Sequence, residues 1–345
     1  MSIPNPLLLI GGTGSPYTRK MVALLRYRRI PYSVIWGDPA KVLGDMGIEK
    51  PKPGLLPTFL LPNENEELVA ITDSTPIIRR LENETNNRSV IPKDPALAFI
   101  NYLLEDFGDE WCTKYMFHYR WYPKEDANNA KGLLPFGIML NLPREQWKQM
   151  KEFIGKRQID RLWVVGSNDT TAPIIDASYR RFLEILEKHL EGMSFLLGHR
   201  PASADFAIYG QLSQLVGFDP TPRAIAHKIS PRTVAWVDLM EDQSGLEPSI
   251  EDWKNIGDLP ESISELLAEL GRVYVPALLA NEKAILNGDK TWESEIDGCK
   301  WTQQTFSYQY KCLKWINEEF QSLSETDQAR VKRLISETGC KLLLK

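Results

Sequence analysis

The stretch that decides the fold is Leu7–Tyr17, which reads LLLIGGTGSPY. Its leading apolar residues predict a short buried strand, and the glycines after them predict a tight turn. Ser15 followed by Pro16 is typical of the N-cap and the first position of a helix, because proline there loses no hydrogen bond. We therefore expect a strand, a turn that bears hydroxyl groups, and a helix that ends near Arg29.

Short apolar runs continue up to residue 71, and a helical period begins at Asp73. The runs predict three further strands, at Tyr32–Trp36, at Thr58–Leu61 after Pro57, and at Leu68–Ile71. Together with the first strand they predict a four-stranded mixed sheet with helices over residues 5–82.

A strand followed by Gly-Gly-Thr-Gly and a helix also fits a dinucleotide-binding turn. That motif needs a third glycine for close packing of helix on strand, and Pro16 stands at that position. Residues 56–69 predict two short strands around a polar turn, where a dinucleotide domain would continue with further βαβ units. A glycine turn without any ligand is the remaining alternative.

Composition narrows the functional classes. The chain has 345 residues and a net charge of −5, without a basic stripe, so nucleic acid is not an expected partner. No apolar run reaches the roughly 18 residues of a membrane helix, and the start of the chain does not read as a signal sequence. The four cysteines show no CxxC or Cys/His spacing, so we expect no metal site and a reducing, cytoplasmic location.

Turn formers between Glu84 and Pro95 predict a domain boundary. We expect domains at 1–84, 95–250 and 251–345, with residues 95–345 nearly all helical and no β-sheet formed mainly beyond residue 100. Helices are predicted at Ala96–Tyr119, after an N-cap at Asp176, and at Ala204–Val216, Pro231–Met240, Ser262–Leu286, Gln304–Leu323 and Glu325–Thr338.

The order of these signals over residues 5–245 resembles the glutathione transferase superfamily. The resemblance implies an α/β thioredoxin-like N-terminal domain and an all-α C-terminal domain, here with a helical C-terminal extension. Gly198–Phe206 resembles the superfamily's Ser/Thr-x-x-Asp helix start, although Ala202 stands where the hydroxyl belongs, so Ser203 is the substitute cap on offer. Asp219–Pro222 and the tail are similar to a group of long bacterial members. A cytoplasmic homodimer with a role in detoxification is also implied.

Glutathione chemistry requires a thiolate, because the thiol, with a pKa of about 8.5, is a poor nucleophile. Members with Ser or Cys directly before Pro-aromatic place that residue at the sulfur, so the resemblance makes Ser15 the catalytic candidate. A plain N-cap is the alternative, with Thr13 and Tyr17 in reserve. Serine in place of cysteine favours transferase or isomerase chemistry over thiol–disulfide exchange.

The resemblance also implies a glutathione site. Pro57 matches the superfamily's cis proline, which would let the Leu56 backbone pair with the cysteinyl backbone; the alternative is a trans proline that opens an edge strand. Asp73 suits the γ-glutamyl ammonium, and Ser74, at a helix start, suits its carboxylate. Simple capping of that helix is the alternative for both.

Aromatic residues at helical spacing follow the boundary and suggest a pocket for a second, electrophilic substrate. We expect Trp111, Tyr115 and Tyr119 to line it together with Tyr17, although such a stripe is also typical of a core. The aromatic residues 260–345 are expected to pack on the helical domain and to help close this pocket. The predicted function is a glutathione-dependent transferase with glutathione as co-substrate; the alternative is a non-catalytic protein of the same fold that serves ligand binding or assembly.

Overall fold

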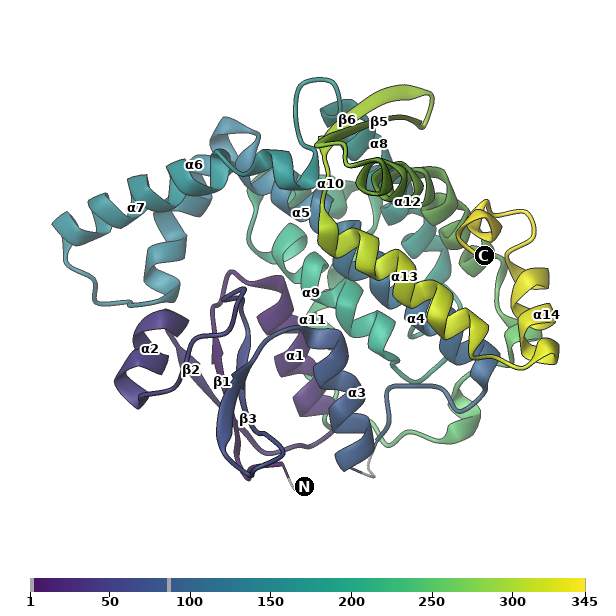
Figure 1. Ribbon diagram of the computed structural model, residues 1–345, viewed down its shortest axis with the longest axis horizontal. Helices are drawn as coiled ribbons and strands as arrows, with labels where there is room; N and C mark the ends of the chain where they lie inside the picture. Colours follow the sequence, from purple (N-terminus) through teal and green to yellow (C-terminus); the bar gives the residue numbers. More distant parts are fainter. Residues whose placement is uncertain (1–2, 86–87, 345) are drawn as a thin grey trace.

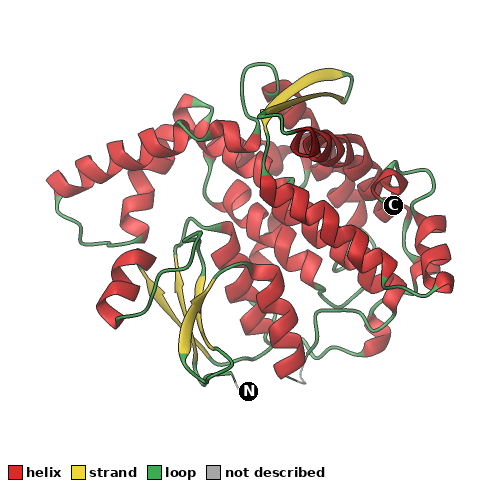
Figure 2. Ribbon diagram, viewed as in Figure 1, coloured by secondary structure: helices red, strands yellow, loops and turns green. Residues whose placement is uncertain are grey.

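The computed structural model describes residues 3–85 and 88–344. A small α/β domain is followed by a larger body that is mainly helical (Figures 1 and 2). Within these ranges, no helix combines the length and the apolar character needed to cross a membrane.

The α/β domain contains the predicted mixed sheet, with the strand order β2-β1-β3-β4. β1 runs parallel to β2 and antiparallel to β3, and β3 runs antiparallel to β4. The strands are β1 (Leu7–Gly11), β2 (Tyr32–Trp36), β3 (Thr58–Pro62) and β4 (Leu68–Ile71). The prediction of a four-stranded sheet is therefore confirmed.

Alternation along β1 distributes its side chains between two hydrophobic layers. Leu7 and Leu9 point into the main core, while Ile10 joins a smaller cluster with Leu43 and Leu60. Helices α1 (Pro16–Tyr27) and α3 (Ser74–Glu84) contribute to the main core, and α2 (Pro39–Met46) covers the opposite face. This arrangement is the predicted thioredoxin-like domain.

The body that follows is built around α9, which packs against both α1 and α4. Gly210 of α9 lies at the closest approach to α1, because a Cβ atom there would stand 2.6 Å from the Pro16 carbonyl oxygen. The elements of this domain are α4 (Pro95–Glu110), α5 (Cys112–Trp121), α6 (Lys124–Leu133), η1 (Leu134–Gly137), α7 (Arg144–Ile159), η2 (Leu162–Val165), α8 (Ala172–His189), α9 (Ser203–Gly217), α10 (Pro220–Ile229) and α11 (Pro231–Met240).

Two helix predictions in this domain need correction. The long helix expected to end at Tyr119 is divided at Trp111 into α4 and α5. Asp176 lies inside α8 rather than at its N-cap, and its carboxylate accepts hydrogen bonds from Arg180 and Tyr119. The hydrogen bond from Tyr119, which is 57 residues away, accounts for an aspartate at this position inside α8, and the local pattern does not reveal it.

The start of α9 also differs from the prediction. Ser203 does not cap the helix; its hydroxyl donates to Glu105 Oε2 at 2.6 Å. Asn101 of α4 supplies the cap, since its Oδ1 accepts from the Ala204 amide at 3.0 Å. Asp205 keeps the carboxylate half of a capping box, because Oδ2 accepts from the Ala202 amide at 2.8 Å.

The C-terminal extension is not all helical, which contradicts our prediction. β5 and β6 pair as a two-stranded antiparallel sheet. Asp297 and Gly298, both with positive φ (52° and 73°), form the turn, a dipeptide that favours two-residue hairpins. The extension contains η3 (Ile250–Asp252), η4 (Ile256–Asp258), α12 (Glu261–Asn287), β5 (Thr291–Ile296), β6 (Cys299–Gln304), α13 (Ser307–Gln321), α14 (Glu325–Leu334) and η5 (Cys340–Leu343).

The extension packs on the helical domain, as its aromatic composition predicted. α12 lies against α8, and α13 lies across α4 and α12 (Figure 1). The Trp301 ring of β6 contacts the Trp111 ring of the body at a centroid distance of 5.6 Å, and both side chains are fully buried. The extension therefore shares the hydrophobic core of the helical domain.

Trp301→Ala should lower the free energy of unfolding by about 3–5 kcal/mol, because it leaves a large cavity against Trp111. Urea denaturation measures this loss. Trp163→Ala is the control, because Trp163 is 43% exposed and its removal should change stability by less than about 1 kcal/mol. Equal, small effects of the two substitutions would contradict the shared core.

Candidate functional site

Ser15 lies where β1 turns into α1. It is the N-cap of α1, and its Oγ accepts a hydrogen bond from the Thr18 amide at 3.2 Å. The same hydroxyl donates to the Leu56 carbonyl oxygen at 3.4 Å, which is long for an O–H···O bond. The capping alternative is thus realised, while the hydroxyl proton is held only weakly.

The Leu56–Pro57 peptide bond is cis, as the resemblance implied. This bond directly precedes β3, so the Leu56 backbone lies at the end of a central strand beside the Ser15 hydroxyl. Ser15, Leu56 and Pro57 are therefore brought together, although 41 residues separate the first two in the sequence.

The turn before Ser15 is fixed by an arginine that the sequence analysis did not single out. Arg120 Nη1 donates to the Gly14 carbonyl oxygen at 2.6 Å, and its Nη2 forms an ion pair with Asp219 at 3.0 Å. Burial raises the pKa of Asp219 to about 6, against the opposing effect of Arg120. Asp219 therefore orients Arg120, and Arg120 in turn stabilises the turn at Gly14.

Asp73 has an unusual backbone conformation, with φ 84° and ψ 109°. Non-glycine residues rarely adopt positive φ, and such strain clusters at functional sites. A side-chain cap of regular geometry is not found at this helix start within the described residues, although the Thr75 amide lies near enough to favour the charged Asp73 carboxylate. Its Oδ2 accepts a hydrogen bond from Tyr308 Oη at 2.9 Å, so Tyr308 is the partner with regular hydrogen-bond geometry.

Ser74 is buried beside Asp73, and its Oγ accepts a hydrogen bond from Lys20 Nζ at 3.1 Å. Lys20 is fully buried on α1 and also donates to Glu105 at 3.0 Å and to Asp109 at 2.6 Å. The Ser74 hydroxyl keeps its own proton for another acceptor. Lys20, Glu105 and Asp109 belong to the site although the sequence analysis missed them.

Glu105 and Asp109 share the ammonium group of Lys20, and Glu105 also faces the Arg79 guanidinium at 3.8 Å. Burial disfavours the Lys20 charge, but Asp109 and Glu105 outweigh it and raise the pKa of Lys20. Burial also opposes ionisation of Glu105, but Lys20, together with Arg79 and the hydrogen bond from Ser203, outweighs it and holds the pKa of Glu105 at about 2. For Asp109, burial prevails over Lys20 and raises the pKa to about 6.

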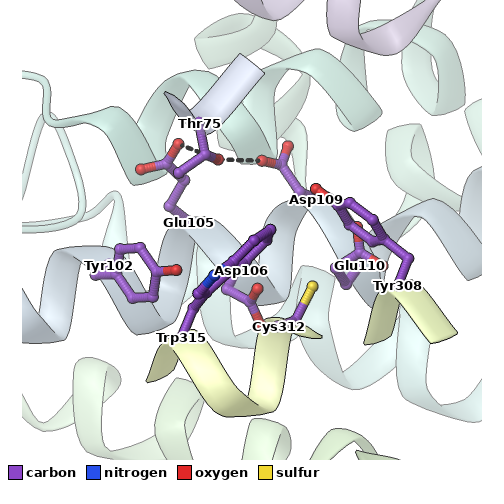
Figure 3. Close-up of a pocket in the computed structure, with 9 residues that line it drawn as sticks. All are labelled: Thr75, Tyr102, Glu105, Asp106, Asp109, Glu110, Tyr308, Cys312 and Trp315. Atoms are coloured by element: carbon purple, nitrogen blue, oxygen red, sulfur yellow. Dashed lines mark hydrogen bonds between the residues drawn. The ribbon is translucent and has the colours of Figure 1, made fainter. Parts of the chain in front are cut away.

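A small cavity of about 20 Å³, room for about one water molecule, lies between α4 and α13 next to this cluster (Figure 3). Burial raises the pKa of Asp106 to about 7 and that of Glu110 to about 8. The cavity is lined by Thr75, Tyr102, Glu105, Asp106, Asp109, Glu110, Tyr308, Cys312 and Trp315. Acidic groups that are partly protonated near neutral pH thus gather beside Asp73.

The predicted aromatic substrate pocket needs correction. Trp111, Tyr115 and Tyr119 are buried in the main core, where Trp111 Nε1 donates to Tyr115 Oη at 3.0 Å. Tyr17 Oη donates to the Asp109 carbonyl oxygen at 2.8 Å. The core alternative describes Trp111, Tyr115 and Tyr119, because they are buried and hydrogen-bonded within the protein. Tyr17 is only half-buried, and its place in a substrate pocket stays a prediction.

A larger cavity, of about 520 Å³, lies between α6, α8 and α10. None of the predicted site residues lines it, although Tyr119 Oη donates to Asp176, which does. Its lining consists of Glu125, Asp176, Arg180, Pro220, Thr221, Ala224, Ile225 and Lys228.

Some of the missed residues leave a recognisable signal. Lys20 is spaced four residues from Pro16 and three from Ala23, so it falls on the buried face of α1. Glu105 and Asp109 are likewise four residues apart on one face of α4. A lysine on an apolar face and an acidic pair on another helix indicate a buried ion cluster, whereas nothing local connects Tyr308 with Asp73.

A thioredoxin-like domain with a cis proline, followed by a helical body, is the arrangement that the sequence analysis expected of a glutathione transferase fold. Residues 9–89 match the family described as glutathione S-transferase, N-terminal domain. This match places the N-terminal domain in that family. No curated protein matches the sequence.

Solved structures similar to this chain include three described as glutathione transferases. A family member from Pseudomonas fluorescens Pf-5, with two glutathione bound, is 15% identical; the match covers 68% of this chain and 88% of that chain, with a TM-score of 0.44. A glutathione S-transferase from Rhodospirillum rubrum F11 is 16% identical, with coverage of 74% and 97% and a TM-score of 0.40. A tau-class enzyme from mango is 16% identical, with coverage of 71% and 94% and a TM-score of 0.38.

Glu110 should make stability depend on pH, because its pKa is raised from 4.5 to about 8 by burial and by the neighbouring acids Asp106 and Asp109. A raised carboxyl pKa gives stability that is full below 4.5 and is lost as the pH rises through 8. The advantage of Glu110→Gln over the native protein should therefore grow by up to about 1.4 kcal/mol per pH unit between these values.

Urea denaturation at several pH values tests this, with Glu337→Gln as a control at an exposed glutamate. If Glu110→Gln and the control follow the same course with pH, Glu110 does not titrate in the folded protein in this way.

Proposed function

We propose that the chain binds glutathione on its N-terminal domain and activates the thiolate for attack on a small electrophile, as a transferase or isomerase. One observation carries the proposal: the weakly held Ser15 hydroxyl, at the N-terminus of α1, lies beside the backbone of the cis-linked Leu56. The match of residues 9–89 to the glutathione S-transferase N-terminal domain supports the same site.

In this proposal the cysteinyl amide of glutathione donates to the Leu56 carbonyl oxygen. It thereby replaces the long hydrogen bond from Ser15, and the Ser15 hydroxyl turns to the sulfur. The Thr18 amide continues to donate to Ser15 Oγ, which orients the hydroxyl and connects it to the positive end of the α1 dipole. Both effects favour the thiolate over the thiol.

The γ-glutamyl end of glutathione would bind at the start of α3. The Ser74 hydroxyl and the N-terminus of that helix would receive the carboxylate, with Lys20 behind them. Asp73, in a cluster with an excess of carboxylates, would receive the ammonium group. Homodimer formation stays a prediction, as do a cytoplasmic location and a role in detoxification.

The alternative is a non-catalytic protein of this fold that serves ligand binding or assembly. One observation favours it: Ser74 and Asp73 are already engaged by Lys20 and Tyr308. Calorimetry with glutathione tests the first function, because a protein that does not bind glutathione cannot use it as a co-substrate.

Ser15→Ala should raise the pH at which the ultraviolet absorbance of the bound glutathione thiolate appears, because the hydrogen bond to sulfur is lost. Ser15→Thr keeps a hydroxyl and should titrate like the native protein. Loss of the cap costs about 0.5–2 kcal/mol, so unfolding curves must accompany the titration. Identical titrations for all three proteins would shift the role to Thr13 or Tyr17.

Ser74→Ala should weaken glutathione binding about ten- to a hundred-fold, because a hydrogen bond to a charged group contributes roughly 1.5–3 kcal/mol. Calorimetry measures the affinity, and Ser336→Ala, at an exposed serine, is the control. Unchanged affinity in a folded Ser74→Ala protein would mean that Ser74 serves only Lys20 and the start of α3.

A further inference from the structure

We propose that Tyr308, on the C-terminal extension, is a positioning residue of the glutathione site, because it orients the Asp73 carboxylate that receives the γ-glutamyl ammonium group. The inference rests on the proposed function and goes beyond it, since it makes the extension part of the site. Tyr308 and Asp73 are 235 residues apart in the sequence.

The Thr75 amide of α3 favours the charged Asp73 carboxylate, but the described residues include no side-chain cap of regular geometry at this helix start. The hydrogen bond from Tyr308 Oη to Oδ2, at 2.9 Å, fixes the carboxylate from the opposite side. A carboxylate offers about four acceptor positions, so an ammonium group can bind while Tyr308 stays in place.

The position of Tyr308 is itself well determined. At the residue before α13, the Phe306 amide donates to Asn281 Oδ1 at 2.8 Å, and Asn281 Nδ2 donates to the Phe306 carbonyl oxygen at 3.0 Å. Asn281 is fully buried on α12, so it anchors the start of α13. The Tyr308 ring also packs edge-on against Trp315, at a centroid distance of 6.0 Å. Figure 3 shows Tyr308 projecting from α13 toward α4.

The charges around Asp73 make its protonation state sensitive to Tyr308. Burial raises the pKa of Asp73, while the hydrogen bond from Tyr308 opposes this and favours the charged carboxylate. Removing the bond should therefore raise the pKa further, and ammonium binding should then be lost at a higher pH. The other titratable groups near Asp73 and Tyr308 are Lys20 on α1, Glu105, Asp106, Asp109 and Glu110 on α4, and Cys312 on α13.

Calorimetry on the full chain can test this role with two ligands, glutathione and its des-amino analogue glutaryl-cysteinylglycine. Tyr308→Phe should weaken glutathione binding, because the Asp73 carboxylate is then less well held and more readily protonated, and it should leave the analogue unchanged. The pH below which the affinity for glutathione falls should also be higher in this variant. Tyr310→Phe, on the same helix, is the matched control and should change neither ligand.

A second measurement does not need glutathione. Carboxyl NMR of aspartate-labelled protein, assigned with Asp73→Asn, should show a higher Asp73 pKa in Tyr308→Phe than in the native protein. If neither ligand binds the native protein, the proposed function fails, while the Asp73 titration still decides whether Tyr308 controls that carboxylate.

Three results would overturn the inference. Equal losses for glutathione and the analogue would mean that Tyr308 only supports the fold. Tighter glutathione binding by Tyr308→Phe would mean that the extension blocks the site. An unchanged Asp73 pKa together with unchanged affinity would mean that the hydrogen bond has no role in binding.

Discussion

The buried ammonium group of Lys20 is the interaction on which the arrangement of the two domains depends. It reaches from α1 to Ser74 at the start of α3, and to Glu105 and Asp109 on α4. Removal of one partner from a buried ion pair typically costs 3–5 kcal/mol, because an uncompensated charge remains in the interior. The domain interface and the proposed glutathione site are therefore held by the same group.

This ion cluster extends into the helical domain through Glu105. Ser203 donates to Glu105 instead of capping α9, and Asn101 supplies the cap that Ala202 lacks. The departure from the superfamily's helix-start signature thus has a physical explanation, since the hydroxyl moved by one residue now serves the buried carboxylate. The start of α9 keeps its hydrogen bonds, while Glu105 gains one within the helical domain.

The C-terminal extension packs against α4 and α8 of the helical domain. Its aromatic residues belong largely to the shared core, as the contact of Trp301 with Trp111 shows. Tyr308 is different, because its hydroxyl donates to the start of α3 in the N-terminal domain. The C-terminal extension therefore contacts both domains.

The sequence by itself determined the four strands of the N-terminal domain, its helices after Ser15 and Asp73, and the N-cap at Ser15, because these follow from local patterns. The cis proline at Pro57 followed from the resemblance to a family motif, and α2 was not predicted. It did not reveal the hairpin at residues 291–304, although Asp297-Gly298 carried a local signal for it. Only the tertiary structure decided that Trp111 and Tyr115 belong to the core, that Lys20 faces Ser74, and that Tyr308 meets Asp73. These contacts join residues far apart in the chain. The periodicity of a helix predicts which of its residues are buried, but it does not predict which buried polar groups become partners when helices pack.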